Sequence, residues 1–368
     1  MRVTRVQVEG LRSLHGVDIA ADHAALWLQG ANGAGKTSVL EALCLMGYGR
    51  SFRGRVSDGL VGKGQAELRV VVHWREASGA RHVAGVEHRG DGWTARLDGA
   101  PVDRLSSLAA PFPVLAFHPQ SSETVTGSAE ERRRLVDWST FHVEPAFAEA
   151  SRRYARALKQ RNALLRAGAP DPEFEFWEQS MDEAAVRMTQ ARERAVDRLV
   201  PELEALWPSL AGGAEPPLLS WRPGWKIDAA LGDLLFLHRS RDRELGYTTA
   251  GPHRADLALG RPFGVEASQW SRGQAKLLAL ALVLAQAEAA ARDGRSPVLL
   301  LDDLRAELDR VRFEAVLDRV VSRGWQAWIT GTEVDMAAVA RLPDLAVFHV
   351  EQGGCWPAHP GDGAFQRL

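Results

Sequence analysis

The sequence is poor in cysteine and in long apolar runs. Among its 368 residues only Cys44 and Cys355 are cysteines, too few for a disulfide framework or a zinc site, which indicates a reducing compartment. The longest apolar run, LLALALVLA from Leu277, is far shorter than the roughly 20 residues of a membrane-spanning helix. The N-terminal stretch MRVTRVQVEG lacks the apolar core of a signal peptide. We therefore expect a cytoplasmic protein with no membrane partner.

The sequence also lacks a large excess of either charge. Its 45 lysines and arginines and 47 aspartates and glutamates give a formal net charge of -2. Because this balance provides no overall attraction to nucleic acid, any nucleic-acid site must be a local patch. The length is enough for two domains, or for one large α/β unit with an insertion.

A phosphate-binding pattern is present near the N-terminus. Gly30, Gly35, Lys36 and Thr37 match GxxxxGK[ST] between a short apolar strand at 25–29 and a helical pattern that begins near Lys36. The glycines allow backbone N–H groups to turn inward around an anion, and the helix N-terminus adds a positive dipole end. Lys36 would reach the outer phosphates of a nucleotide, and the Thr37 hydroxyl would bind Mg²⁺.

A pair of acids meets the second requirement of such a site. The run VLLLDD predicts a buried strand that ends at Asp302 and Asp303. Asp302 would hold Mg²⁺ through water, and Asp303 would orient the attacking water. Taken alone, the two acids could be a solvated strand end. Together with a phosphate loop, they favour a hydrolytic site.

The order of elements predicts a nucleotide-binding domain that is split in sequence. Val3, Val6 and Val8 predict a first strand, and residues 68–102 have the pattern of a β-meander. A helical hairpin follows, broken by APDPEF, with arms of about 22 to 25 residues. Strand-like runs return after Tyr247, in SPVLLLDD, WQAWITGT and LAVFHVEQ.

The stretch WSRGQAKLLALAL has a serine and a glycine where an apolar helix begins. A hydroxyl, backbone N–H groups and the helix dipole form an anion site around Ser271 and Gly273. A chain with its own phosphate loop does not need a second grip on the γ-phosphate, so this grip would hold ATP bound to another copy. The alternative is that Ser271 is an ordinary helix cap.

These motifs resemble the ABC ATPase superfamily, whose signature is Ser-x-Gly-Gln, and within it the RecF family, which is related to SMC heads. The resemblance implies an α/β fold, an ABC-type (SMC/RecF-like) P-loop ATPase head split around a helical insertion. Residues 1–115 and 246–368 would form the head, with the β-meander in its lobe I, and residues 116–245 would form helical lobe II. The resemblance covers nearly the whole chain and is carried in order by GANGAGKTSVLEAL, GRSFRG, FHPQ, GSAEERRRLVDW, YARALKQRNALL, GYTTAGPHRADL, WSRGQAKLLALAL and LLLDDLRAELD.

The resemblance also implies ATP and Mg²⁺ as ligands and assigns residues to them. Asp303 and Gln120 would be catalytic, with Gln120 sensing the γ-phosphate or the metal. Thr37 and Asp302 would bind the metal, and the segment 307–309 would be the D-loop that crosses between subunits. The nucleotide would be bound by Gly30, Ala31, Asn32, Gly33, Ala34, Gly35, Lys36, Thr37, Ser38 and Arg53, and across a dimer by Ser271, Arg272, Gly273 and Gln274.

Several of these residues have a structural alternative or depart from the family pattern. Gln120, which stands where many RecF-like chains have glutamate, could be a polar loop residue, and Arg53 could be an ion-paired arginine. The GPHR segment at 251–254 is best interpreted as a packed turn. Asp303 replaces the glutamate of most ABC ATPases, which predicts slow hydrolysis. Residues 330–332 stand where transporters have a histidine.

The function implied by the resemblance is that of a DNA replication and repair ATPase. An ATP-dependent homodimer would clamp single-stranded, gapped or double-stranded DNA, and slow, DNA-dependent hydrolysis would release it. The dimer would promote recombinase loading in recombinational repair and the SOS response, with RecR and RecO as partners. One alternative is a transporter ATPase subunit, which the missing histidine disfavours. Another is a nuclease fusion, for which the stretch after Asp309 is too short.

A basic surface for DNA is expected on the first hairpin helix. Arg152, Arg156 and Lys159 share one helical face, which suits contacts with phosphates that carry no sequence information. The alternative is a solvated helix face. The other basic residues of this region are Arg132, Arg133, Arg134, Arg153, Arg161 and Arg166.

Overall fold

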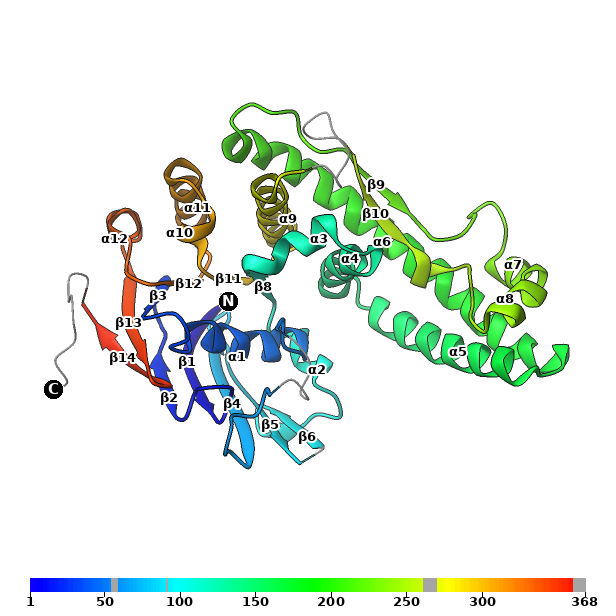
Figure 1. Cartoon of the computed structure of the whole chain (residues 1–368), viewed down its shortest axis with the longest axis horizontal. Coiled ribbons are helices and arrows are strands. Elements are labelled where there is room, and N and C mark those ends of the chain that lie inside the picture. The colour runs from blue at the N-terminus through cyan, green and yellow to red at the C-terminus, as the bar shows by residue number, and fades with distance from the viewer. Residues whose placement is uncertain (54–58, 91, 261–269, 360–368) are drawn as a thin grey trace. The chain divides into compact units, whose positions relative to one another are not determined.

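The computed structural model describes residues 1–53, 59–90, 92–260 and 270–359. They belong to two compact units (Figure 1): unit 1 comprises Met1–Gln120 and Gly294–Leu368, and unit 2 comprises Ser121–Asp293. Each unit is built from its own strands and helices, so each is described separately.

The division differs from the sequence-based one, which resumes the head at residue 246. Residues up to Asp293 belong to unit 2, because β10 (Asp256–Leu259) pairs with β9 (Leu219–Arg222) and α9 (Arg272–Arg292) packs on α6 (Glu175–Ala211). The first boundary also moves from 115 to 120, since β8 (Val114–Phe117) pairs with a strand of unit 1.

The first sheet of unit 1 is antiparallel and has the strand order β2-β1-β4-β5-β6-β7. It confirms the first strand and the meander, and its alternating burial places Val3, Val6 and Val8 in the core. Its strands are β1 (Arg2–Glu9), β2 (Val17–Ala20), β4 (Glu67–Arg75), β5 (Arg81–Arg89), β6 (Gly92–Leu97) and β7 (Ala100–Pro101).

The second sheet has the order β14-β13-β3-β12-β11-β8 and is parallel except for β14. All residues of β3, β11 and β12 are buried, as expected for strands covered on both faces. Because these strands are parallel, the segments that follow them emerge at one edge of the sheet. Besides β8, the strands are β3 (Ala25–Gln29), β11 (Val298–Leu301), β12 (Ala327–Gly331), β13 (Leu345–Glu351) and β14 (Gly354–Ala358).

Helix α1 (Lys36–Tyr48) contacts strands of both sheets and joins them into one core (Figure 1). Leu40 and Leu43 of α1 lie in the same cluster as Val70 of the first sheet and Leu28 of the second. The helix that follows the phosphate loop is therefore anchored to both sheets. The remaining helices of unit 1 are α2 (Ser106–Ala109), α10 (Leu304–Glu307), α11 (Arg310–Arg323) and α12 (Met336–Arg341).

Unit 2 is mainly helical, and its longest elements form the predicted hairpin. Helix α5 (Phe147–Ala167) packs on α6 through Tyr154, Ala157, Met181 and Met188. The other elements are η2 (Pro119–Ser122, at the boundary), α3 (Glu123–Thr126), α4 (Ala129–Val143), η3 (Asp171–Phe174), α7 (Leu231–Leu237), α8 (Arg239–Leu245) and η4 (Pro252–Arg254), with β9, β10 and α9.

Two elements of unit 2 differ from simple expectation. Helix α6 has 37 residues and continues through Pro201 and Pro208, since Leu203, Leu206 and Trp207 beyond the first proline are buried. Helix α9 is long and apolar enough for a membrane span by composition, but 78% of its apolar window is buried inside the structure, as in a core helix.

Candidate nucleotide-binding site

The loop between β3 and α1 has the backbone that the phosphate pattern requires. Gly30, Gly33 and Gly35 have φ angles of 152°, 81° and 115°, which side chains of L-residues rarely adopt. A Cβ added to Gly30 would lie 2.2 Å from the carbonyl oxygen of Val350. The first glycine is thus required both by its conformation and by the closeness of β13.

Lys36 folds back over this loop and is only 5% exposed. Its ammonium donates hydrogen bonds to the carbonyl oxygens of Gly30 (2.8 Å) and Ala31 (3.0 Å). Burial lowers the pKa of Lys36, and the nearby charges of Asp303 and Asp302 oppose that shift. A cation held at the mouth of an N–H-lined loop fits a nucleotide phosphate.

Thr37 and Asp302 meet at the start of α1. The Thr37 hydroxyl lies 3.0 Å and 3.1 Å from the two carboxylate oxygens of Asp302, and the Thr330 hydroxyl donates to Asp302 Oδ1 at 2.7 Å. Burial raises the pKa of Asp302, while the hydrogen bonds from Thr330 and Thr37 lower it. A hydroxyl and a carboxylate together suit Mg²⁺, which usually takes one or two protein oxygens along with phosphates and water.

Asp303 has a left-handed backbone, with φ 51° and ψ 31°, and stands at the N-terminus of α10. Its N–H donates to the Thr330 hydroxyl at 2.8 Å. Burial, followed by the charge of Asp302, raises the pKa of Asp303. The turn separates the two carboxylates: Asp302 is 3% exposed beside Thr37, whereas Asp303 is more exposed.

Thr330 is a site residue that sequence reasoning missed. It was noted only as part of the segment that replaces a transporter histidine, yet its hydroxyl bonds to both residues of the acidic pair. The available signal was its place at the end of β12, the parallel neighbour of β11.

Gln120 and Arg53 belong to the same unit as this site, but their polar contacts are longer or more exposed than those that join Thr37, Asp302 and Thr330. Gln120 is exposed three residues after β8, and its Oε1 accepts from His118 Nδ1 at 3.1 Å. The Nη1 of Arg53 is 3.9 Å from Glu41 Oε2, and burial raises the pKa of Asp302 while the charge of Arg53 opposes that rise. Both the functional and the structural interpretation of each residue fit these contacts.

The signature residues belong to unit 2 and form a capping box at the start of α9. The Gln274 N–H donates to Ser271 Oγ at 3.2 Å, and the Ser271 N–H donates to Gln274 Oε1 at 2.8 Å. Ser271, Arg272 and Gly273 are exposed. Ser271 therefore caps helix α9, and because the residue is exposed, its hydroxyl is also accessible to a ligand.

The segments 307–309 and 251–254 have structural roles. The Asp309 carboxylate accepts from the Arg312 N–H at 2.9 Å and caps α11, within the segment matched to the D-loop. In the GPHR segment, His253 Nδ1 accepts from the Tyr154 hydroxyl at 2.8 Å, and Nε2 donates to the carbonyl of Thr248 at 3.0 Å. GPHR is thus a packed turn.

The predicted basic surface is smaller than the sequence indicates. Arg132 pairs with Asp256, Arg133 donates to the carbonyl of Ala255, and Arg134 pairs with Glu130 and Glu131. Arg161 is wholly buried and pairs with Glu178 and Asp242, and Arg153 pairs with Glu183. Among the described residues, Arg152, Arg156 and Lys159 are exposed and form no ion pair.

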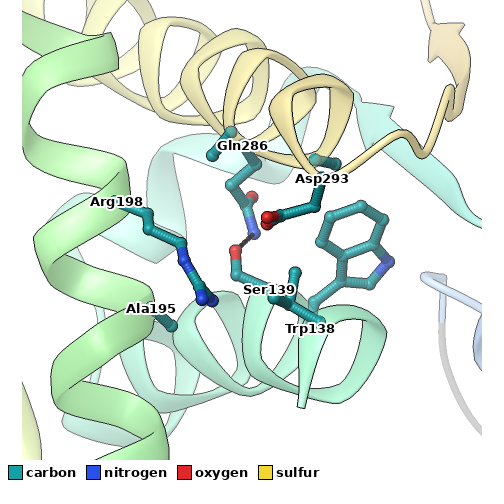
Figure 2. A pocket seen from close by; sticks show the side chains of 9 residues that line it. Trp138, Ser139, Ala195, Arg198, Gln286 and Asp293 are labelled. Carbon is teal, nitrogen blue, oxygen red and sulfur yellow. Dashed lines mark hydrogen bonds between the residues drawn. The ribbon is translucent and has the colours of Figure 1, made fainter. Parts of the chain in front are cut away.

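A small hollow in unit 2 is shown in Figure 2. Gln286 of α9 donates to the Ser139 hydroxyl of α4 at 2.9 Å, and Asp293, Trp138 and Arg198 also line it. It is much too small for a nucleotide, so it does not compete with the loop of unit 1 as the ATP site.

Comparison with known proteins agrees with this geometry. Residues 2–354 match the family described as the RecF/RecN/SMC N terminal domain. The DNA replication and repair protein RecF of Xanthomonas euvesicatoria is 47% identical over 363 residues, covering 96% of this chain and 98% of that protein. The chain belongs to the RecF family. RecF of Stenotrophomonas maltophilia is 44% identical, covering 95% and 98%, and that of Shewanella baltica 32%, covering 96% and 98%.

Solved structures support the RecF-type fold. A structure described as the recombination mediator protein RecF with ATP in the RecFOR pathway has a TM-score of 0.85 at 21% identity and covers 97% of this chain and 98% of that chain. An SMC head domain from Pyrococcus furiosus has a TM-score of 0.58 at 16% identity, covering 97% and 96%. The ABC-type ATPase head shared by RecF and SMC proteins is therefore the fold of this chain, and the transporter alternative is not favoured.

Proposed function

We propose that this chain is an ATP-gated DNA clamp that acts in DNA replication and repair. ATP joins two copies, the dimer encloses DNA, and hydrolysis releases both. The observation that carries this proposal is the convergence of Thr37, Asp302 and Thr330 beside a loop whose lysine already binds backbone oxygens.

Binding of ATP and Mg²⁺ would use groups that are hydrogen-bonded within the site in this structure. Lys36 would exchange the carbonyls of Gly30 and Ala31 for the outer phosphate oxygens, and the N–H groups of residues 31–38 would bind the inner phosphates. Thr37 and Asp302 would turn from their mutual hydrogen bond to the metal, which neutralises phosphate charge when bound.

Hydrolysis would be slow and stimulated by DNA. Asp303 is the carboxylate available to orient water, and its side chain is one methylene shorter than the glutamate of most ABC ATPases. Burial, followed by the charge of Asp302, raises the pKa of Asp303, which makes this carboxylate a better proton acceptor than an ordinary aspartate. Gln120 would contact the γ-phosphate or the metal from the same sheet edge.

A second copy would complete the site. Ser271, Arg272, Gly273 and Gln274 are at the N-terminus of the 21-residue helix α9, and the first three are exposed. The Ser271 hydroxyl accepts one hydrogen bond within the cap and can still donate its proton to a phosphate oxygen. ATP would then stabilise a homodimer by mass action, because it binds the paired form better.

DNA would be contacted through Arg152, Arg156 and Lys159. These side chains follow one face of α5 over about 10 Å, at 1.5 Å per residue, and are not neutralised by acids among the described residues. Single-stranded, gapped and double-stranded DNA all present the phosphates that such a row binds.

The partners are proposed from the family to which the chain belongs. The relatives are named DNA replication and repair proteins, and one structural relative is described as part of the RecFOR pathway. RecR and RecO are accordingly the proposed partners in the cytoplasm, and loading of recombinase in recombinational repair and the SOS response is the proposed outcome.

A DNA-binding titration tests the proposal. Fluorescence anisotropy would compare gapped and fully duplex DNA, with and without ATP, using Lys36→Arg as the matched control because it keeps the charge but alters the phosphate contacts. The wild type should bind DNA more tightly with ATP and prefer the gap, and Lys36→Arg should lose the ATP effect. Binding that is unchanged by ATP would contradict the clamp.

A further inference from the structure

Glu41, on the helix that follows the phosphate loop, has a fully buried carboxylate that is shared by several side chains. Arg12 donates from Nη2 to Oε1 at 2.9 Å and from Nε to Oε2 at 3.1 Å. The Ser51 hydroxyl also donates to Oε1. The nearest nitrogen of Arg53 is 3.9 Å from Oε2, beyond hydrogen-bond distance.

The two arginines are held very differently. The side chain of Arg12 is 17% exposed, its φ angle is 54°, and its N–H donates to the carbonyl of Leu60 at 2.9 Å. A non-glycine residue in this conformation is fixed by its surroundings. The Arg53 side chain is 44% exposed. Its backbone N–H donates to Ser51 Oγ at 2.9 Å, and among the described residues its guanidinium has no hydrogen-bond partner.

The position of Arg53 links Glu41 to the nucleotide site. Glu41 lies one turn after Thr37 on α1, and the Arg53 guanidinium lies 3.9 Å from the Glu41 carboxylate, so Arg53 stands beside the helix that begins at the phosphate loop. A buried carboxylate requires a neutralising partner, and Arg12 supplies one with a two-point contact. Arg53 can therefore turn away from Glu41 without leaving a buried charge unpaired.

We infer that Arg12 is a positioning residue for ATP recognition: by neutralising Glu41, it leaves the Arg53 guanidinium available to the γ-phosphate. This inference rests on the proposed ATP site. Without Arg12, Glu41 captures Arg53 in a charge-assisted pair and withdraws it from the phosphates. The effect falls on ATP and not on ADP, because only ATP presents a γ-phosphate.

Nucleotide titrations with fluorescently labelled ATP and ADP, in the presence of Mg²⁺, test the inference. Arg53→Ala and Arg12→Met should each weaken ATP binding about tenfold, a change of about 1.4 kcal/mol, and leave ADP binding within about twofold. Arg12→Met/Arg53→Ala should bind ATP no more weakly than Arg53→Ala, since both changes remove the same contact. Arg12→Met/Glu41→Gln should recover ATP affinity, because the neutral amide no longer captures Arg53.

Two further variants separate positioning from folding. Arg12→Lys keeps a charge beside Glu41 and should retain ATP affinity within about threefold. Arg5→Met removes an arginine whose partner, Asp18, is on the surface of the same unit, and should change neither affinity.

The possible results are distinct. Arg12→Met with wild-type ATP affinity, or with equal losses for ATP and ADP that Glu41→Gln does not restore, would overturn the inference. An Arg12→Lys variant that binds ATP as weakly as Arg53→Ala would also overturn it. This second outcome decides the question even if the Arg12→Met variant does not fold. Equal ATP binding by the wild type and Lys36→Ala would instead reject the ATP site itself.

Discussion

Thr37 and Asp302 are 265 positions apart in the sequence, yet the hydroxyl of Thr37 lies 3.0 Å from Oδ1 of Asp302. The contact exists because β3 and β11 flank β12 in one parallel sheet, so the segments that follow both strands emerge at the same edge. It brings together the proposed metal-binding hydroxyl and carboxylate.

Replacing Lys36 by alanine should weaken ATP binding about 100-fold, because charge-assisted hydrogen bonds to phosphate are lost, each of about 1.5–3 kcal/mol. Isothermal titration calorimetry with ATP measures the change. The matched control is Lys63→Ala, which removes an exposed lysine of the same unit and should bind ATP as the wild type does. A Lys36→Ala variant with unchanged affinity would contradict the assignment of the loop.

Asp303→Asn should lower the rate of ATP hydrolysis at least about 100-fold, since the carboxylate that we propose accepts the water proton is removed. ATP binding should persist, because asparagine also tolerates the left-handed backbone of this position. Phosphate release is the measurement. Asp98→Asn, at another left-handed aspartate of unit 1, should hydrolyse ATP at the wild-type rate; equal rates for both variants would exclude Asp303 as the base.

The strands, the hairpin and the backbone of the phosphate loop were predictable because their signals are local. The phosphate loop, the apolar strand before the acids and the alternation in β1 each lie within a few consecutive residues. The boundary near 293 was not predictable in this way, because it depends on whether α9 packs on α6 or on the sheet of unit 1. Proline normally ends a helix, so the pattern also gave no reason to extend α6 beyond Pro201.

Sequence analysis missed Thr330, Arg12 and Glu41 for a related reason. The contacts of each side chain are with residues from other parts of the sequence, which a local pattern does not reveal. Arg161 is different, because a usable signal was present. It follows Tyr154 and Ala157 at helical spacing and precedes Leu165, so it lies on the apolar face of α5, and all four residues are buried. Its two acidic partners come from α6 and α8, which the pattern of α5 alone cannot reveal.

Arg156→Gln should weaken DNA binding and reduce the slope of log affinity against log salt by about 1, as expected when a single phosphate contact is lost. Fluorescence anisotropy over a salt series measures both effects. Arg134→Gln is the control, because Arg134 is already paired with Glu130 and Glu131. A larger effect at Arg134 than at Arg156 would place the DNA surface elsewhere.

The folded state should lose stability between pH 7.5 and pH 5 because of His253. Burial, the largest cause, lowers the pKa of His253 from 6.5 to about 4. The unfolded chain therefore binds a proton that the folded chain does not, and falling pH favours unfolding by about 2 kcal/mol over this range. Urea unfolding at the two pH values measures the difference.

His253→Gln should show a smaller pH dependence of its urea midpoint than the wild type. The exposed residue His15 provides the control, since His15→Gln should leave the wild-type dependence in place. An identical pH dependence in the wild type and His253→Gln would show that His253 is not the responsible group.

The central claim is that ATP joins two copies through the signature at Ser271. Sedimentation velocity of the wild type and of Ser271→Arg, each with and without saturating ATP and Mg²⁺, tests it most directly. The wild type should change from monomer to dimer when ATP is added. Ser271→Arg should bind ATP yet stay monomeric, because the larger, charged arginine side chain disrupts the cap that is proposed to meet the ATP of the second copy. A wild type that remains monomeric with ATP bound would contradict the account.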